Sequence, residues 1–138
     1  MTPRQKLLVQ ETFAKVVPIS DQAAALFYGR LFETVPALRA LFKADMQAQG
    51  RKLMQMLGTC VSKLDALDQL VPAVKELGRK HVAYGVSDAD YAAVGAALLW
   101  TLEQGLGPAF TTEVREAWTD VYQTLASTMI AGAYAAPG

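Results

Sequence analysis

The sequence contains very little of the two residue types that build most metal and redox sites. It has one cysteine, Cys60, and one histidine, His81, in 138 residues. A single cysteine cannot form a disulfide within the chain, and no Cys/His cluster has the spacing of a zinc site. We therefore expect no disulfide framework and no structural zinc, and a reducing compartment such as the cytoplasm is the expected location.

Excess charge and long apolar runs are also missing. Thirteen basic residues balance thirteen acidic ones, which leaves no net field to attract nucleic acid or an anionic membrane. No window of about 18 uninterrupted apolar residues occurs. The first nine residues carry Arg4 and Lys6 and lack the apolar segment of a signal peptide. Neither nucleic acid nor a membrane is expected as a partner.

Apolar side chains are what the sequence has in excess. They make up 52% of the residues against 19% charged, and the mean hydropathy is +0.18. A chain of 138 residues is the usual size of one domain, so a single domain over residues 1–138 is predicted, with a frayed tail over 131–138. The interior of such a domain is small. The excess predicts that some apolar residues cover a flat ligand or a partner.

The apolar residues recur at spacings of three and four, and no strand-like alternation is present. This pattern predicts an all-α fold with about six or seven helices. A first helix is expected from a capping box at Thr2 and Gln5 to about Val16, and a second is expected to be capped by Ser20. Further helices are expected near 36–42, from about 47 to 64, from 71 to 84, from 87 to 105 and from 112, and a polar loop is expected over 43–50.

His81 lies on the same helix face as Val74 and Leu77. A histidine in such a place is more often a core or surface residue than a ligand. A poorly solvated imidazole nevertheless needs a strong partner for its nitrogens, and a metal is one such partner. One imidazole cannot build a zinc or non-haem iron site, but a haem supplies four nitrogens itself and needs only one axial ligand from the protein.

Tyr28 and Gln49 are polar groups on otherwise apolar helix faces. Each has an ordinary alternative, since a core tyrosine usually hydrogen-bonds a backbone carbonyl and a glutamine at a helix start is usually solvated. Phe42 and Leu53 could likewise be simple core residues. What favours one common pocket is the joint occurrence, in order along the chain, of Tyr28, Phe42, Gln49, Leu53, His81 and Tyr91.

The chain resembles the bacterial single-domain globins and the haem domain of flavohaemoglobins over nearly its whole length. The stretches that carry the resemblance are Leu26–Phe32, Leu41–Phe42, Arg51–Met54, Leu77–His81, Tyr84–Val86, Tyr91 and Ala117–Trp118. No single stretch is specific, but together they are. The resemblance implies a globin fold around one haem pocket, with haem b (iron protoporphyrin IX) as cofactor.

The resemblance also implies residue roles. His81 would bind the haem iron, Phe42 would stack on the porphyrin, and Leu53 would lie over the gas-binding side. Tyr28 and Gln49 would donate hydrogen bonds to bound oxygen. The remaining expected cofactor contacts are Leu77, Val86, Tyr91 and Lys52, of which Lys52 would reach a propionate or would instead be an ordinary solvated lysine.

The chain departs from the flavohaemoglobin pattern on the His81 side of the pocket. In those proteins the tyrosine matched by Tyr91 joins a glutamate near the end of the chain, but the expected position here is Ala133. No reductase domain follows Gly138 in this sequence. Peroxidase-like or self-contained nitric oxide dioxygenase activity is therefore not expected.

Several functions remain open on this evidence. The favoured one is reversible binding of dioxygen, with carbon monoxide and nitric oxide as further ligands, by a binding protein rather than an enzyme. The alternatives are a nitric oxide dioxygenase with a separate reductase and a gas sensor. A haem-free helical interaction module, in which the apolar excess covers a protein partner, is the alternative from a different class.

Overall fold

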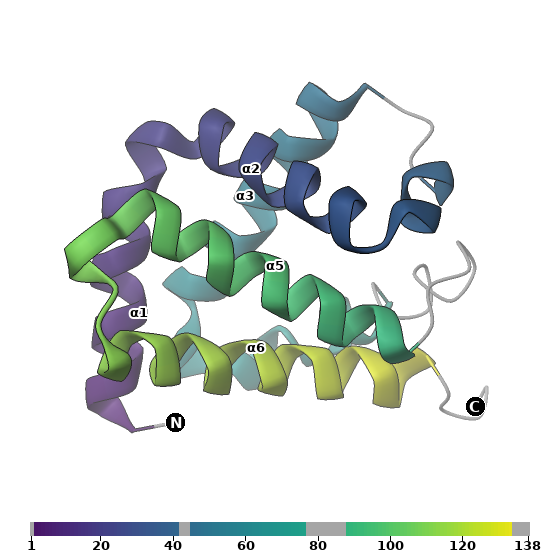
Figure 1. Cartoon of the computed structure of the whole chain (residues 1–138). Coiled ribbons are helices and arrows are strands. Elements are labelled where there is room, and N and C mark those ends of the chain that lie inside the picture. The colour runs from purple at the N-terminus through teal and green to yellow at the C-terminus, as the bar shows by residue number, and fades with distance from the viewer. Residues whose placement is uncertain (1, 42–44, 77–87, 134–138) are drawn as a thin grey trace.

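The described part of the chain is almost entirely helical. The computed structural model describes residues 2–41, 45–76 and 88–133, and these residues contain no strand, so the predicted all-α fold is confirmed (Figure 1). In chain order the elements are α1 (Pro3–Val16), the 3₁₀ helix η1 (Val17–Ile19), α2 (Ser20–Thr34), η2 (Pro36–Leu41), α3 (Met46–Ser62), η3 (Leu64–Gln69), a helical stretch over 71–76, α5 (Asp88–Leu106), η4 (Gly107–Ala109) and α6 (Thr112–Ala133).

The start of α1 is fixed by the predicted capping box. The Thr2 hydroxyl accepts from the Gln5 backbone N–H at 3.1 Å, and the Gln5 side-chain carbonyl accepts from the Thr2 N–H at 2.9 Å. Pro3 occupies the first helical position, where no N–H is needed. The Gln5 amide also donates to Asp120 of α6 at 2.7 Å, so the same residue joins the start of α1 to α6.

The predicted cap at Ser20 is wrong. Ser20 is the first residue of α2, the preceding N-cap residue is Ile19, and no side chain caps this helix. The reason is that η1 leads directly into α2, so Ser20 already has helical backbone angles (φ −59°, ψ −39°) and its hydroxyl is not placed as a cap.

Two other boundaries differ from prediction. Helix α3 begins at Met46, because the Asp45 side chain accepts from the Gln47 N–H at 3.0 Å and caps it, so the polar segment 46–50 is helix rather than loop. At the other end of the chain α6 continues to Ala133, past the point where the tail was expected to begin.

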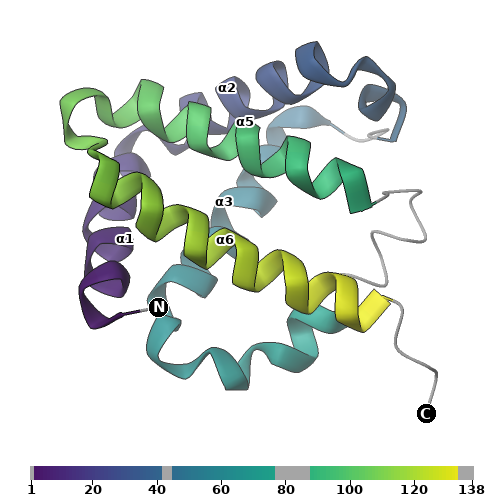
Figure 2. The same cartoon turned by 60° about the horizontal axis from the view of Figure 1, so that its bottom comes forward.

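The helices cross one another around a shared core. Helices α5 and α6 lie side by side, and α1 crosses near one end of both (Figures 1 and 2). Helix α2 packs on α5 and α3, while α1 packs on α6 and α3. The most deeply buried large side chains are those of Trp118, Leu31, Leu64 and Val9. The buried apolar cluster to which they belong also takes residues from α3 and α5, so the core lies between α1, α2, α3, α5 and α6.

One buried hydrogen bond crosses this core. The indole Nε1 of Trp118 donates to the Thr12 hydroxyl at 2.9 Å, which joins α6 to α1. Among the described helices, none combines the length and the apolar character needed to cross a membrane.

Candidate functional site

Tyr28 is buried near the middle of α2, with only 7% of its surface exposed. Two aromatic rings of the same helix surround its ring. The Phe27 ring meets it edge-on with a centroid distance of 5.0 Å, and the Phe32 ring, one turn later, stacks on it at 5.8 Å and 28°. Both arrangements are favourable for aromatic pairs. The phenol therefore lies in an aromatic cluster that limits its rotation.

Gln49 reaches Tyr28 because α2 and α3 cross very closely. A Cβ atom built on Gly50 would lie only 2.9 Å from the Ala24 Cβ, so the backbone of α3 comes closer to α2 than any larger residue would allow. Gln49 is the residue before Gly50, and Tyr28 lies one helical turn after Ala24. The crossing therefore brings the predicted pair Tyr28 and Gln49 together.

The electrostatics of this pair keep the phenol neutral. Burial raises the pKa of the Tyr28 hydroxyl, and a side-chain hydrogen bond with Gln49 lowers it in part. The net direction is upward, so Tyr28 is protonated at neutral pH and is a hydrogen-bond donor. Both groups of the pair are uncharged, which suits a small, weakly polar ligand better than a free cation.

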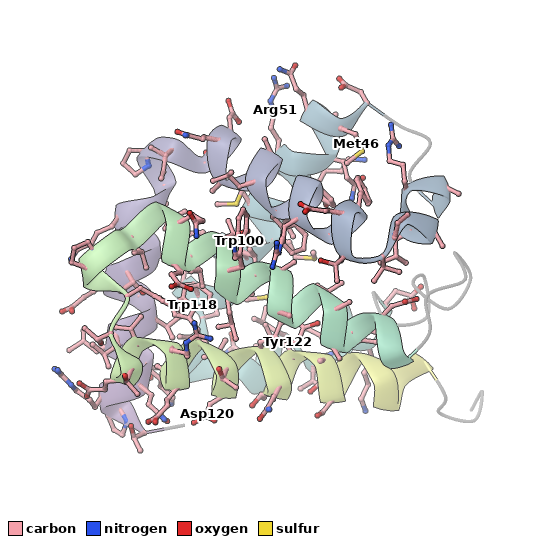
Figure 3. All side chains as sticks on the ribbon, viewed as in Figure 1. Met46, Arg51, Trp100, Trp118, Asp120 and Tyr122 are labelled. Carbon is pink, nitrogen blue, oxygen red and sulfur yellow. The ribbon has the colours of Figure 1, made fainter. Side chains whose placement is uncertain are left out.

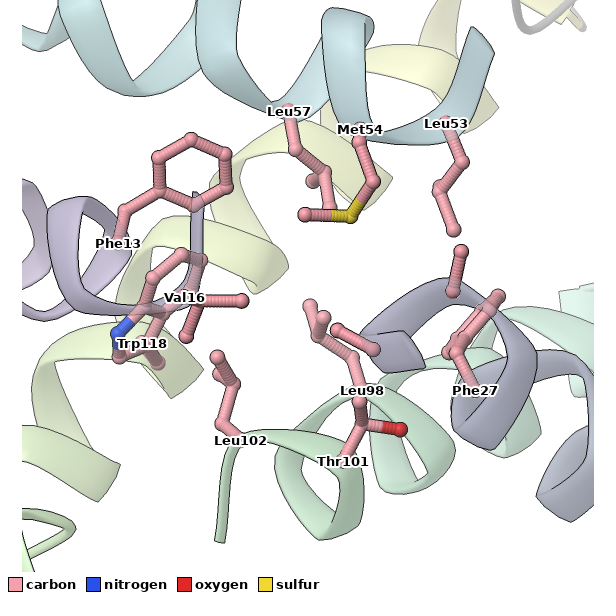
Figure 4. Close-up of a pocket in the computed structure, with 12 residues that line it drawn as sticks. Phe13, Val16, Phe27, Leu53, Met54, Leu57, Leu98, Thr101, Leu102 and Trp118 are labelled. Carbon is pink, nitrogen blue, oxygen red and sulfur yellow. The ribbon is translucent and has the colours of Figure 1, made fainter. Parts of the chain in front are cut away.

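A small cavity lies in the core between α1, α2, α3, α5 and α6, and neither Tyr28 nor Gln49 is among its lining residues. Its volume is about 20 Å³, which is room for one molecule of the size of water or a diatomic gas. Leu53, one turn after Gln49 in α3, is one of its walls (Figure 4). The other lining residues, from α1, α2, α3, α5 and α6, are Phe13, Val16, Ala23, Ala24, Phe27, Met54, Leu57, Leu98, Thr101, Leu102 and Trp118.

The polar atoms of that lining already have partners. The Thr101 hydroxyl donates to the Ala97 carbonyl at 2.8 Å, and the Trp118 indole donates to Thr12. A water inside the cavity needs two to four polar partners, and the side chains of this lining offer it only the lone pairs of the Thr101 hydroxyl. The cavity is therefore a dry, apolar space.

The other predicted site residues are distributed as follows. Lys52 is exposed on α3, and Leu53 is half-buried. Tyr91 is buried at the start of α5, with 7% of its surface exposed. Phe42, Leu77, His81 and Val86 lie outside the described residues.

Tyr122 makes a partly buried hydrogen bond that the sequence alone did not reveal. Figure 3 shows Tyr122 between α5 and α6. Its hydroxyl, on α6, donates to the Tyr91 backbone carbonyl on α5 at 2.6 Å, and its ring lies against Gly95, where a Cβ would be 2.7 Å from the ring. Burial raises the pKa of Tyr122, and neighbouring Tyr91 raises it further. The only signal in the sequence was its helical spacing from Trp118.

The described residues contain no group of three His, Cys, Asp or Glu side chains that could hold a metal ion. The donors near the α2–α3 crossing are a phenol and an amide, with the apolar Leu53 beside them. This donor set fits a gas held beside an apolar ring system, because it offers hydrogen bonds without charge.

Comparison with known proteins gives one consistent result. The family model described as Globin matches residues 25–129. Neuroglobin of Danio rerio is 32% identical to the chain, covering 96% of the chain and 92% of that protein. Neuroglobin of Tetraodon nigroviridis is 33% identical over the same shares.

A solved structure is similar as well. It is an engineered carbene transferase, a putative nitric oxide dioxygenase from Rhodothermus marinus. The TM-score is 0.87 at 25% sequence identity, over 96% of this chain and 93% of that one. The likeness thus extends along nearly the whole chain in both sequence and fold.

Proposed function

The chain belongs to the globin family, and we propose on that basis that it binds one haem b through His81 and reversibly binds dioxygen and other diatomic gases beside Tyr28 and Gln49. The observation that carries this proposal is the buried, neutral Tyr28 phenol held next to Gln49 at the α2–α3 crossing. Single-domain organisation and a cytoplasmic location stay predictions.

A bound haem would supply the iron that takes up the gas. His81 would be its axial ligand, and Phe42, Leu53, Leu77, Val86, Tyr91 and Lys52 would be the further contacts predicted from the resemblance. Because His81 is the only histidine, two histidines of one chain cannot occupy both sides of the iron. The iron would therefore be open to a gas, or would be held by water or the Tyr28 oxygen in the ferric state.

Tyr28 and Gln49 would select among gases by polarity. Bound dioxygen carries partial negative charge, whereas bound carbon monoxide is nearly nonpolar, so a hydrogen bond from the phenol favours dioxygen. Such a charge-assisted bond contributes about 1.5 to 3 kcal/mol, which corresponds to roughly ten- to a hundredfold slower release of dioxygen. The Gln49 amide can donate to the gas or to the phenol oxygen, so its contribution is expected to be smaller.

Replacement of Tyr28 by Phe tests this role. We expect dioxygen to dissociate about tenfold faster or more, with little change for carbon monoxide, because only dioxygen loses a hydrogen bond. Stopped-flow or flash photolysis of both gases measures the two rates. Equal effects on the two gases would contradict the proposed role of Tyr28.

Two simpler measurements test the cofactor itself. The purified protein, produced with sufficient iron and haem precursor, should have a Soret band, and His81→Ala should lose the pigment or change its ligand spectra. A colourless wild-type protein would favour the haem-free interaction module.

Nitric oxide dioxygenation with a separate reductase is the second candidate function. The observation in its favour is the similarity to the structure from Rhodothermus marinus, which is described as a putative nitric oxide dioxygenase. A single reaction of the oxygenated protein with nitric oxide does not separate the candidates. Sustained consumption of nitric oxide with a cellular reductant would favour this second function over simple gas binding.

A further inference from the structure

The orientation of the Tyr28 ring depends on residues beyond Gln49. The hydroxyl lies at the far end of the ring, so a small rotation of the side chain moves it away from any acceptor. Hydrogen bonds weaken steeply when distance and angle deteriorate. A tyrosine that discriminates between gases therefore needs contacts that fix the ring as well as a partner for the oxygen.

Phe32 supplies such a contact, and a second element anchors it. Its ring stacks on the Tyr28 ring from one helical turn away, with centroids 5.8 Å apart. The guanidinium of Arg39, which belongs to η2, lies over the Phe32 ring at 5.6 Å from the centroid. A cation over an aromatic face is attracted by the ring quadrupole. Arg39, Phe32 and Tyr28 thus form a continuous series of contacts from the surface to the buried phenol.

We propose that Phe32 is a positioning residue for Tyr28: stacked on the phenol ring and anchored by the Arg39 guanidinium, it holds the hydroxyl where it donates to a bound gas. The inference rests on the proposed function, because it assumes that Tyr28 faces the gas. It assigns to Phe32 a role in gas selectivity without any contact of its own with the gas.

The decisive variant is Phe32→Leu, which keeps an apolar side chain on α2 but removes the stacked ring. Dioxygen should dissociate roughly three- to tenfold faster, because an aromatic pair contributes a modest part of the constraint on Tyr28. Carbon monoxide dissociation should change by less than about twofold, since it depends little on the phenol. In the ferrous carbon monoxide complex the C–O stretching band should broaden or move to higher wavenumber, because the donor is no longer held in one place.

The chain offers a matched control. Phe110 is also partly buried against the core, and the Arg115 guanidinium lies over its ring at 5.2 Å. Phe110→Leu therefore removes the same kind of Arg–Phe pair without touching Tyr28, and it should leave both gas rates and the C–O band unchanged. Phe32→Tyr, which retains a stacking ring, should keep dioxygen dissociation within about twofold of the wild type.

Measuring Tyr28→Phe in the same experiment distinguishes a failure of the proposed function from a failure of the positioning role of Phe32. If Tyr28→Phe does not accelerate dioxygen release selectively, the proposed function itself is wrong. If it does, but Phe32→Leu leaves the rates and the band unchanged or alters both gases equally, the positioning role is wrong. If Phe32→Leu fails to fold, Arg39→Gln, at an exposed position, takes its place. A roughly twofold increase in the dissociation rate of dioxygen, without a change for carbon monoxide, would support the positioning role. An unchanged dioxygen rate would overturn it.

Discussion

The Thr12 hydroxyl serves two partners at once in the core. It donates to the Leu8 carbonyl of its own helix at 2.7 Å and accepts from the Trp118 indole at 2.9 Å. Both Thr12 and Trp118 are buried, at 4% and 1% exposure. The Thr12 hydroxyl oxygen therefore accepts the one hydrogen bond that the Trp118 indole N–H can donate.

Thr12→Val should cost about 1–3 kcal/mol of unfolding free energy, because it leaves the indole N–H buried without its acceptor. Denaturant unfolding of the wild type and the variant, monitored by circular dichroism, measures the difference. Thr101→Val is the matched control. Thr101 is equally buried and donates to a carbonyl of its own helix, but no indole depends on it among the described contacts. Equal losses in the two variants would show that the indole contact adds nothing.

At the scale of helices, the contact between α5 and α6 depends on Tyr122 and Gly95 together. The glycine provides the space for the ring, and the hydroxyl then reaches the Tyr91 carbonyl at 2.6 Å. Gly95 is central in a helix, where glycine is normally unfavourable by roughly 0.5–1 kcal/mol relative to alanine. The close packing of the ring explains why a glycine is tolerated there.

Because of this partly buried tyrosine, the free energy of unfolding should decrease as the pH rises into the alkaline range. Burial raises the pKa of Tyr122 in the folded chain above the ordinary value of about 10 that the unfolded chain retains. The unfolded chain therefore loses the proton first as pH rises, so the stabilisation is complete below about pH 10 and declines above it. Tyr122→Phe should be less stable at neutral pH but should lose less stability between about pH 9 and 11. Parallel stability curves of variant and wild type, from denaturant unfolding across that range, would contradict the assignment.

The sequence predicted those features that depend on neighbouring residues. The Thr2–Gln5 capping box was predictable because both partners lie within one turn, and the face shared by Gln49 and Leu53 follows from helical spacing. Ser20 was misassigned because its residue type suits a cap, whereas the 3₁₀ turn Val17–Ile19 runs directly into α2 and makes Ser20 its first residue.

Contacts between distant segments were beyond sequence reasoning. The approach of Gly50 to Ala24 and the bond from Tyr122 to Tyr91 both depend on how helices cross. Tyr28 and Gln49 were identified through family resemblance and their helix faces, but only the crossing explains why they meet. The roles predicted for His81 and Phe42 stay predictions.

At the scale of the molecule, α1 and α6 are held together mainly by the core. Arg4 of α1 pairs with Glu113 of α6 at 2.9 Å, but both side chains are more than half exposed, and such surface pairs contribute little. The Trp118–Thr12 bond and the apolar contacts around it are shielded from solvent. Salt should therefore have only a minor influence on how α1 and α6 associate.

The dry cavity between the helices has a consequence for how the protein responds to compression. An empty space in the folded state disappears on unfolding, so unfolding reduces the total volume and hydrostatic pressure favours it.

Val16 lines the cavity, and Val16→Ile would place an additional methyl group there. The variant should unfold at higher pressure, whereas Val121→Ile, at a buried site outside the cavity lining, should be destabilised by overpacking of about 1–3 kcal/mol. Fluorescence of the tryptophans under increasing pressure would record both midpoints, and a molecule with this void should yield to compression sooner than one whose interior is filled.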